Sequence, residues 1–248
     1  MSPGGSGDQP LRGKVAVVTG AGRGIGRAIA LAYAESGAAV CCTARTREQI
    51  DDTAALIRRA GGTGIAVAAD VTDPEAVTRM FDAAVEALGG VDILVANAGG
   101  VLESKPVTEG DPALWEATVA VNLFGAYHCI RAAIPHLRRR GGGKILTMGS
   151  GMGHNGLAGH SAYCCAKAAL WMLVRVSARE LWADGISVNE LIPGPVLTDA
   201  TRGGGAVAGI DSEWVKSPEE VVPLALFLAT QPDVGPTAQS FSLMRRDG

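Results

Sequence analysis

The sequence has little charge in excess of either sign. Its 22 Lys and Arg against 25 Asp and Glu leave a net charge of −3, and residues 137–144 (LRRRGGGK) form the only dense basic run. Nucleic acids and anionic membranes attract proteins through clustered cations, so we expect neither as a partner. No uninterrupted apolar run approaches the roughly 20 residues that cross a bilayer. These absences predict a soluble protein.

Metal-binding and secretory signals are also missing. The five cysteines form no CxxC pair and no ligand spacing with the four histidines, so we expect reduced, structural thiols and no metal site. Residues 1–10 (MSPGGSGDQP) lack the cationic start and apolar centre of a secretory signal. We therefore expect a cytoplasmic protein, with a flexible leader over 1–12 and one domain over 13–248.

Short apolar runs alternate with helix-like segments along the whole chain. Strands are expected over 14–20, 38–44, 64–70, 91–99, 144–150, 186–192 and 238–243. Helices are expected over 26–37, 46–62, 73–90, 112–139, 161–183 and 217–230. This alternation predicts the α/β class: a Rossmann-type, doubly wound parallel sheet of about seven strands, with helices on both faces, in a single domain.

The first strand-to-helix turn, residues 19–26 (TGAGRGIG), is rich in glycine. Glycines here let the backbone approach a pyrophosphate closely, and the helix N-terminus favours its negative charge. The strict GxGxxG fingerprint fails, since Ile25 stands where the third glycine should be. The pattern that fits is TGxxxGxG, and with it the sequence resembles the short-chain dehydrogenase/reductase family, including its 3-oxoacyl reductase-like members.

The resemblance extends from about Lys14 to Phe241 and includes several motifs in the family's order. Residues 96–99 (ANAG) are similar to its NNAG motif, 163–167 (YCCAK) match YxxxK, and 193–198 (PGPVLT) look like its PG turn. The resemblance implies an NAD(P)-dependent oxidoreductase. The implied catalytic residues are Asn122, Ser150, Tyr163 and Lys167. The implied cofactor-binding residues are Gly20, Gly22, Arg23, Gly24, Ile25, Gly26, Ala44, Arg45, Arg47, Asp70, Val71, Asn97, Ala98, Gly99, Tyr163, Lys167, Pro193, Gly194, Val196 and Thr198.

Tyr163 and Lys167 are four residues apart, so on a helix they share one face. Lowering a phenol pKa from near 10 by roughly three units needs about 4 kcal/mol, whereas an exposed ion pair supplies about 1 kcal/mol at most. We therefore expect a partly desolvated site in which Lys167 and the oxidised nicotinamide favour the phenolate. Ser150 would hold the substrate oxygen, and Asn122 would tie a water to Lys167. The adjacent Cys164 and Cys165 turn away from Tyr163 and are interpreted as packing residues.

The second strand ends without an acid that could read a ribose hydroxyl. Its last residue is Ala44, followed by Arg45 and Arg47, and Arg23 lies in the glycine turn. These cations predict NADP(H) in preference to NAD(H). The alternative is that Arg45 and Arg47 only flank a solvated helix start.

Residues near the expected substrate mouth carry weaker signals. Met152, His154 and His160 are candidate substrate contacts, and Glu190, an acid in an apolar strand, is expected to make a structural hydrogen bond. The substrate depends on 100–106, 151–160 and 195–217, and the glycine-rich 202–209 loop is expected to move. A small-molecule or acyl-CoA-type carbonyl ranks above a carrier-bound one, although 138–140 could contact an acidic carrier.

Other activities stay open from the sequence. The chain could reduce a ketone or aldehyde, or run as an NAD(P)-dependent alcohol dehydrogenase in the oxidative direction. A dehydratase or epimerase that uses the cofactor transiently, or an idle NADP-binding sensor or scaffold, would share this fold. The resemblance also implies a homotetramer or homodimer packed through the helix over 112–139 and the helix carrying Tyr163.

Overall fold

The computed structural model describes residues 9–198 and 214–244 and contains a seven-stranded parallel sheet. The strands are β1 Val15–Thr19, β2 Ala39–Ala44, β3 Thr63–Ala68, β4 Ile93–Ala96, β5 Gly143–Met148, β6 Ile186–Ile192 and β7 Ser240–Ser242. Their order across the sheet is β3-β2-β1-β4-β5-β6-β7, with every neighbouring pair parallel. The predicted doubly wound fold is confirmed.

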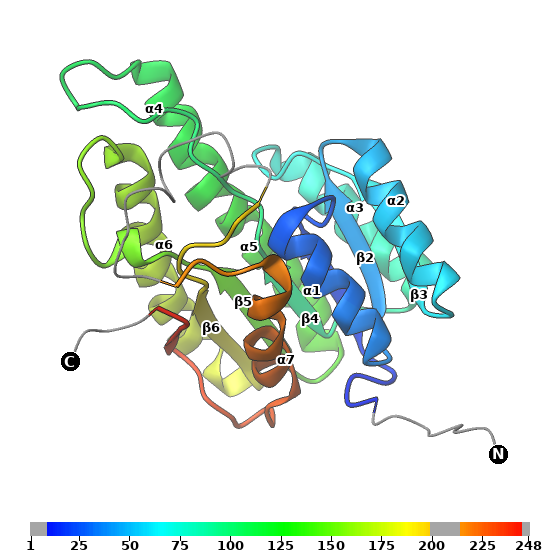
Figure 1. Cartoon of the computed structure of the whole chain (residues 1–248). Helices are drawn as coiled ribbons and strands as arrows, with labels where there is room; N and C mark the ends of the chain where they lie inside the picture. Colours follow the sequence, from blue (N-terminus) through cyan, green and yellow to red (C-terminus); the bar gives the residue numbers. More distant parts are fainter. Residues whose placement is uncertain (1–8, 199–213, 245–248) are drawn as a thin grey trace.

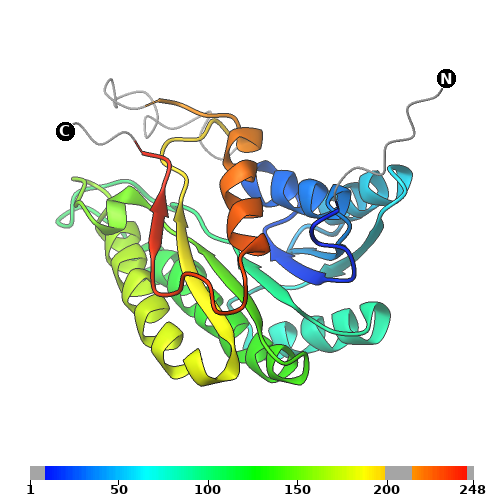
Figure 2. The same ribbon diagram turned by 90° about the horizontal axis from the view of Figure 1, so that it is seen from below.

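Helices cover both faces of the sheet (Figure 1). The longer helices are α1 Gly24–Glu35, α2 Arg47–Arg59, α3 Pro74–Leu88, α4 Pro112–Val119, α5 Gly125–Arg139, α6 Ser161–Glu180 and α7 Val222–Thr230. Seen along the sheet, α1 and α7 lie on one side and α3, α5 and α6 on the other (Figure 2). Successive β1 residues follow this division, because Val18 belongs to the core under α1 while Val17 belongs to the core over α3 and α5.

A π-helical turn, Ala120–Phe124, joins α4 to α5, so the expected long helix is present over 112–139. Among the described residues, this 28-residue stretch alone is long and apolar enough to pass for a membrane span, with a mean hydropathy of 1.2 in the tested window. Polar residues such as Glu116 and Arg131 interrupt this stretch, so it contains no long uninterrupted apolar run. Ala126, Cys129 and Ala133 of this stretch are buried in the core, and 39% of the tested window is buried.

The fold begins earlier than the expected boundary at residue 12. Leu11 is 1% exposed and its backbone N–H donates to the Ser36 carbonyl at the end of α1, at 2.9 Å. The last residues of the expected leader therefore pack against the domain, and residues 1–8 lie outside the described part.

The order of the strands determines where a ligand can enter. From β1 the chain winds outward to β2 and β3, then returns to place β4 on the other side of β1. The connections on the two sides of this point leave over opposite faces, which opens a crevice at the carboxyl ends of β1 and β4. The glycine turn and the ANAG segment both lie at this edge.

Candidate active site

A cavity of about 350 Å³ lies at the carboxyl ends of the strands and contains most of the residues singled out from the sequence. Of those, it is lined by Gly20, Gly22, Arg23, Gly24, Ile25, Ala44, Arg45, Asp70, Val71, Asn97, Ala98, Gly99, Tyr163, Lys167, Pro193, Gly194, Val196 and Thr198. The lining also includes residues that the motifs did not indicate: Thr46, Gln49, Ala69, Gly100, Val121, Met148 and Gly149. No motif indicates Gln49, because it lies in the first turn of α2 and not at the end of a strand.

The glycine turn forms a backbone cradle at the start of α1. Gly20 has a φ of +67°, and a Cβ on Gly26 would come within 2.4 Å of the Gly20 carbonyl oxygen and 2.5 Å of the Asn97 side-chain nitrogen. Only glycine fits this approach. Arg23, the N-cap of α1, makes no side-chain capping bond. The first N–H groups of the helix are therefore available to an anion, so this cradle fits the pyrophosphate of a dinucleotide.

Thr19 and Asn97 hold the ends of β1 and β4 together. The Thr19 hydroxyl accepts the backbone N–H groups of Asn97 and Ala98, each at 2.9 Å. The Asn97 side chain donates in return to the Thr19 carbonyl at 2.8 Å. These bonds replace the regular strand ladder, which is why β4 ends at Ala96 although the sequence analysis extends the strand to residue 99.

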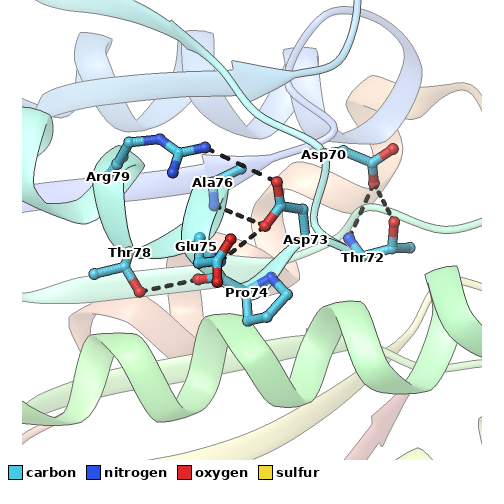
Figure 3. Close-up of polar contacts among 8 residues, drawn as sticks. All are labelled: Asp70, Thr72, Asp73, Pro74, Glu75, Ala76, Thr78 and Arg79. Carbon is cyan, nitrogen blue, oxygen red and sulfur yellow. Dashed lines mark hydrogen bonds and ion pairs between the residues drawn. The ribbon is translucent and has the colours of Figure 1, made fainter.

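The end of β3 supplies a carboxylate at the cavity edge. One oxygen of Asp70 accepts both the backbone N–H of Thr72, at 2.9 Å, and its hydroxyl, at 2.8 Å (Figure 3). Asp73 then caps α3 by accepting the N–H groups of Ala76 and Glu75, and these bonds hold the pKa of its carboxyl below the usual value. Asp70 is thereby fixed in an Asx-type turn directly before a capped helix.

The helix α6 brings Tyr163 and Lys167 to the cavity wall on one face, as their spacing predicts. Lys167 is 3% exposed; its Nζ donates to the Met148 carbonyl at 2.8 Å and lies 5.4 Å from the centre of the Tyr163 ring. The Ser150 hydroxyl, just past the end of β5, lies near enough to the Tyr163 phenol to lower its pKa. Three of the four implied catalytic side chains are therefore brought together here.

Burial determines the proton affinities of this group. Desolvation raises the pKa of Tyr163, and the nearby Ser150 hydroxyl offsets part of that rise. Desolvation lowers the pKa of Lys167 to about 8, and the nearby Glu190 carboxylate opposes this change. The phenol of Tyr163 is accordingly protonated at neutral pH and able to donate its proton. The pKa of Lys167 lies close to neutral pH, so small changes around Lys167 alter the fraction that is charged.

Asn122 occupies the π-helical turn between α4 and α5 and is 1% exposed. Its side-chain nitrogen donates to the carbonyls of Gly100, at 2.7 Å, and Thr118, at 2.8 Å, while its oxygen accepts the Gly100 N–H at 3.1 Å. A Cβ on Gly99 would lie 2.5 Å from that oxygen and 3.5 Å from Lys167 Nζ. The turn thus places Asn122 beside Lys167, behind the ANAG loop.

Some predicted residues have other partners. Arg47 is absent from the cavity lining and pairs with Asp51 one turn along α2, at 2.8 Å. His160 contacts the Ser104 hydroxyl at 3.2 Å, and the backbone N–H of Met152 donates to the Ser150 hydroxyl. None of Met152, His154 and His160 lines the cavity.

The cysteines of α6 differ from the packing interpretation. Cys164 is half-buried and Cys165 is exposed, because α6 turns this side of its first two turns away from the sheet. All five cysteines are free, and in the described parts of the chain no cluster of three or more metal-ligating side chains is present. The glycine-rich 202–209 loop, to which the sequence analysis assigns mobility, lies outside the described residues.

Comparison with known proteins agrees with the geometry. The family model for short chain dehydrogenase matches residues 14–206. A chloroplastic NADPH-dependent aldehyde reductase-like protein of Arabidopsis thaliana is 35% identical over 89% of this chain and 88% of its own length. Cis-4-hydroxycyclohexanecarboxylate dehydrogenase of Sinomonas cyclohexanicum is 37% identical over 88% of this chain and 89% of its own.

A solved structure has the same overall fold. The short-chain type dehydrogenase/reductase of Mycobacterium marinum superposes with a TM-score of 0.87 at 32% identity, covering 95% of each chain. A nicotinamide dinucleotide cradle beside a Tyr-Lys pair defines an oxidoreductase of the Rossmann type. The chain belongs to the short-chain dehydrogenase/reductase family and is an NAD(P)-dependent oxidoreductase.

Proposed function

We propose that the protein reduces a ketone or aldehyde carbonyl to an alcohol with NADPH. The observation that carries the proposal is the meeting of Tyr163, Lys167 and Ser150 at the end of the cofactor cavity, with Asn122 behind them. The nicotinamide supplies a hydride to the carbonyl carbon. The protein's own residues have to bind the carbonyl oxygen and deliver one proton to it.

Each residue has a distinct part in that proton delivery. Ser150 donates a hydrogen bond to the substrate oxygen and orients it toward Tyr163, which transfers its phenolic proton as the oxygen gains negative charge. The Lys167 ammonium stabilises the phenolate that remains, since burial alone opposes its formation. Asn122 lies next to Lys167 on the side of the ANAG loop. There it can position a water molecule that returns a proton to Lys167.

The preference for NADPH is supported by charge at the cavity edge. Arg23 and Arg45 line the cavity, and Ala44 occupies the end of β2 without an acid that could bind a ribose hydroxyl. Two guanidinium groups suit a phosphate on that ribose. The Arabidopsis relative carries NADPH dependence in its name.

The substrate is proposed to be a small molecule or an acyl-CoA-type carbonyl, including a 3-oxoacyl group, in the cytoplasm. The basic run does not favour an acidic carrier. Arg138 pairs with Asp184 at 2.7 Å, and Arg140 pairs with Asp92 at 2.9 Å. Two of the three arginines are thus already bound within the chain.

Oxidation of an alcohol is the second candidate. The Sinomonas relative is named a dehydrogenase of a cyclic hydroxy acid. The same residues serve this direction when Tyr163 is first deprotonated and then accepts the hydroxyl proton. Direction then depends on the substrate and on the ratio of reduced to oxidised cofactor.

A single substitution tests the catalytic proposal. Tyr163→Phe removes only the phenolic oxygen, so we expect cofactor binding, followed by fluorescence quenching, to persist while NADPH oxidation falls at least about a thousandfold. The assay uses a panel of 3-oxoacyl thioesters, cyclic ketones, quinones and steroids. Unchanged turnover by the variant would assign the chemistry elsewhere. Cofactor binding without turnover of any substrate by the wild type would favour the sensor.

A further inference from the structure

A carboxylate outside the family motifs is buried behind the active site. Glu190 lies on β6, which is next to the edge strand β7, and is 0% exposed. Isolating a charged carboxylate from water costs several kcal/mol unless other groups compensate the charge. The contacts around Glu190 therefore indicate what its charge does.

One Glu190 oxygen has two partners and the other has none. Oε2 accepts the Ser240 hydroxyl from β7 and lies 3.2 Å from His154 Nε2. Oε1 is buried and makes no hydrogen bond within the described residues. The structural hydrogen bond expected from the sequence is present with Ser240, but Oε1 has no hydrogen-bond partner among the described residues.

The uncompensated oxygen faces the backbone of the active site. A Cβ on Gly149 would come within 2.1 Å of Glu190 Oε1, so the carboxylate fills the space that any side chain at residue 149 would need. Gly149 lies between Met148, whose carbonyl accepts the Lys167 ammonium, and Ser150. Glu190 and Lys167 thus approach the same short piece of chain, and both are almost fully buried.

We propose that Glu190 is a positioning residue whose negative charge keeps Lys167 protonated in the buried site. The proposal rests on the function given above, in which the Lys167 ammonium strengthens Tyr163 as an acid. Lys167 and Glu190 make no direct hydrogen bond, so the effect is electrostatic and acts through the intervening backbone. His154 and Ser240 hold the carboxylate in place from its other side.

The charges around the pair are few. On α6, Tyr163 and Lys167 face the cavity. The chain after β5 places His154 and the neutral Ser150 near the pair. The other neighbours are neutral side chains: Asn122 of the π-helical turn and Ser240 of β7. The His154 side chain is 30% exposed and lies edge-on to Trp171, whose other neighbour is Arg175. Among these groups, Glu190 is the anion that opposes the desolvation of Lys167.

The sign of the expected pH effect follows. Burial lowers the pKa of Lys167 to about 8, and Glu190 prevents a larger drop. Neutralising Glu190 therefore lowers the pKa further, and Lys167 loses its proton at a lower pH. Below roughly pH 6, Lys167 is protonated both in the wild type and in a variant without the Glu190 charge. As the pH rises above that range, Lys167 loses its proton in the variant at a lower pH than in the wild type.

Glu190→Gln tests this with little change of shape. We expect the basic limb of the kcat profile for carbonyl reduction to move down by about one pH unit, giving about fivefold less activity near pH 8, about tenfold less above pH 9 and nearly wild-type activity near pH 6. NADPH binding near pH 6 should be unchanged. NMR of isotope-labelled lysine in the protein without cofactor should show the Lys167 midpoint moving down from about 8.

Two further variants make the result decisive. Glu190→Met has a similar volume and no unpaired polar atom, so it provides the same neutralisation should the Gln variant not fold. Glu86→Gln makes the same chemical change on the exposed face of α3 and should leave the profile alone. An unshifted limb and an unshifted Lys167 midpoint in the folded variants would overturn the role of Glu190. That outcome is distinct from failure of the proposed function, which Tyr163→Phe reports separately.

Discussion

At the residue scale, the proposed preference for NADPH depends on Ala44, the last residue of β2. Ala44 lines the cavity beside Arg45, and the nearest acid along the chain, Glu48, belongs to the first turn of α2. A carboxylate at residue 44 would accept the hydrogen bonds of a ribose hydroxyl and repel a phosphate at the same place. One side chain can therefore reverse the preference.

We expect Ala44→Asp to lower the ratio of kcat/KM with NADPH to that with NADH by roughly tenfold to a hundredfold, since a misplaced like charge costs about 1 to 3 kcal/mol. Steady-state assays with both cofactors on one substrate measure this ratio. Ala60→Asp, at the exposed C-terminal end of α2, is the control. The charge argument fails if wild-type enzyme uses NADH as well as NADPH.

Residue-scale prediction worked where a motif specifies local spacing. Tyr163 and Lys167 share a helix face because they are four positions apart, and the glycine turn follows its strand directly. The pairing of Glu190 with His154 had no such signal, since 36 residues separate them and only the alignment of β5 with β6 brings them together. Sequence shows an unusual acid there, but not its neighbours.

At the element scale, the first turn and the end of β4 form one assembly. Gly26 begins the buried face of α1 and touches both Gly20 and the Asn97 side chain. The sequence pattern predicts β1, α1 and β4, but it extends β4 past its end. The hydrogen bonds from the Asn97 and Ala98 N–H groups to the Thr19 hydroxyl depend on the register of two strands far apart in the chain, so no local pattern indicates them.

Gly26→Ala should break this assembly. The added methyl would overlap the Gly20 carbonyl, where backbone surrounds it, so we expect a loss of about 1 to 3 kcal/mol in the free energy of unfolding and at least tenfold weaker cofactor binding. Urea denaturation and a fluorescence titration measure the two effects. Gly156→Ala, where an added Cβ meets nothing within 4 Å, should change neither. Equal cofactor affinity in both variants would contradict the cradle.

At the scale of the whole molecule, exposed apolar side chains occur on α6 and on the π-helical turn with α5. Phe124 and Tyr127, along the π-helical turn and α5, are 52% and 43% exposed, and Met172 and Val176 on α6 are 49% and 43% exposed. A contiguous apolar surface commonly marks an interface between subunits. We propose that two copies pack through these exposed side chains, and that this contact is the interface of a homodimer or one interface of a homotetramer.

The double variant Phe124→Glu with Met172→Glu should weaken that interface, because it buries carboxylates against apolar neighbours. Light scattering on a sizing column should give a dimer or tetramer for the wild type and a species near the 25.3 kDa chain mass for the variant. Val107→Glu, on a 79% exposed loop residue, should leave the mass unchanged. A wild type that elutes as a monomer would refute the interface.

The position of β6 and β7 also affects how the enzyme is made. By the time a ribosome has released α6, the nascent chain holds the glycine turn, Ser150, Tyr163 and Lys167. It still lacks β6 with Glu190 and β7 with Ser240, which come last in the chain and complete one edge of the sheet. Since contacts that are distant in sequence form late, the glycine turn can form during synthesis, while the wall behind Lys167 and the cavity residues 193–198 wait for the C-terminal part of the chain. The turn that fits the pyrophosphate and the wall that supports proton transfer would thus be completed at different moments in the folding of one molecule.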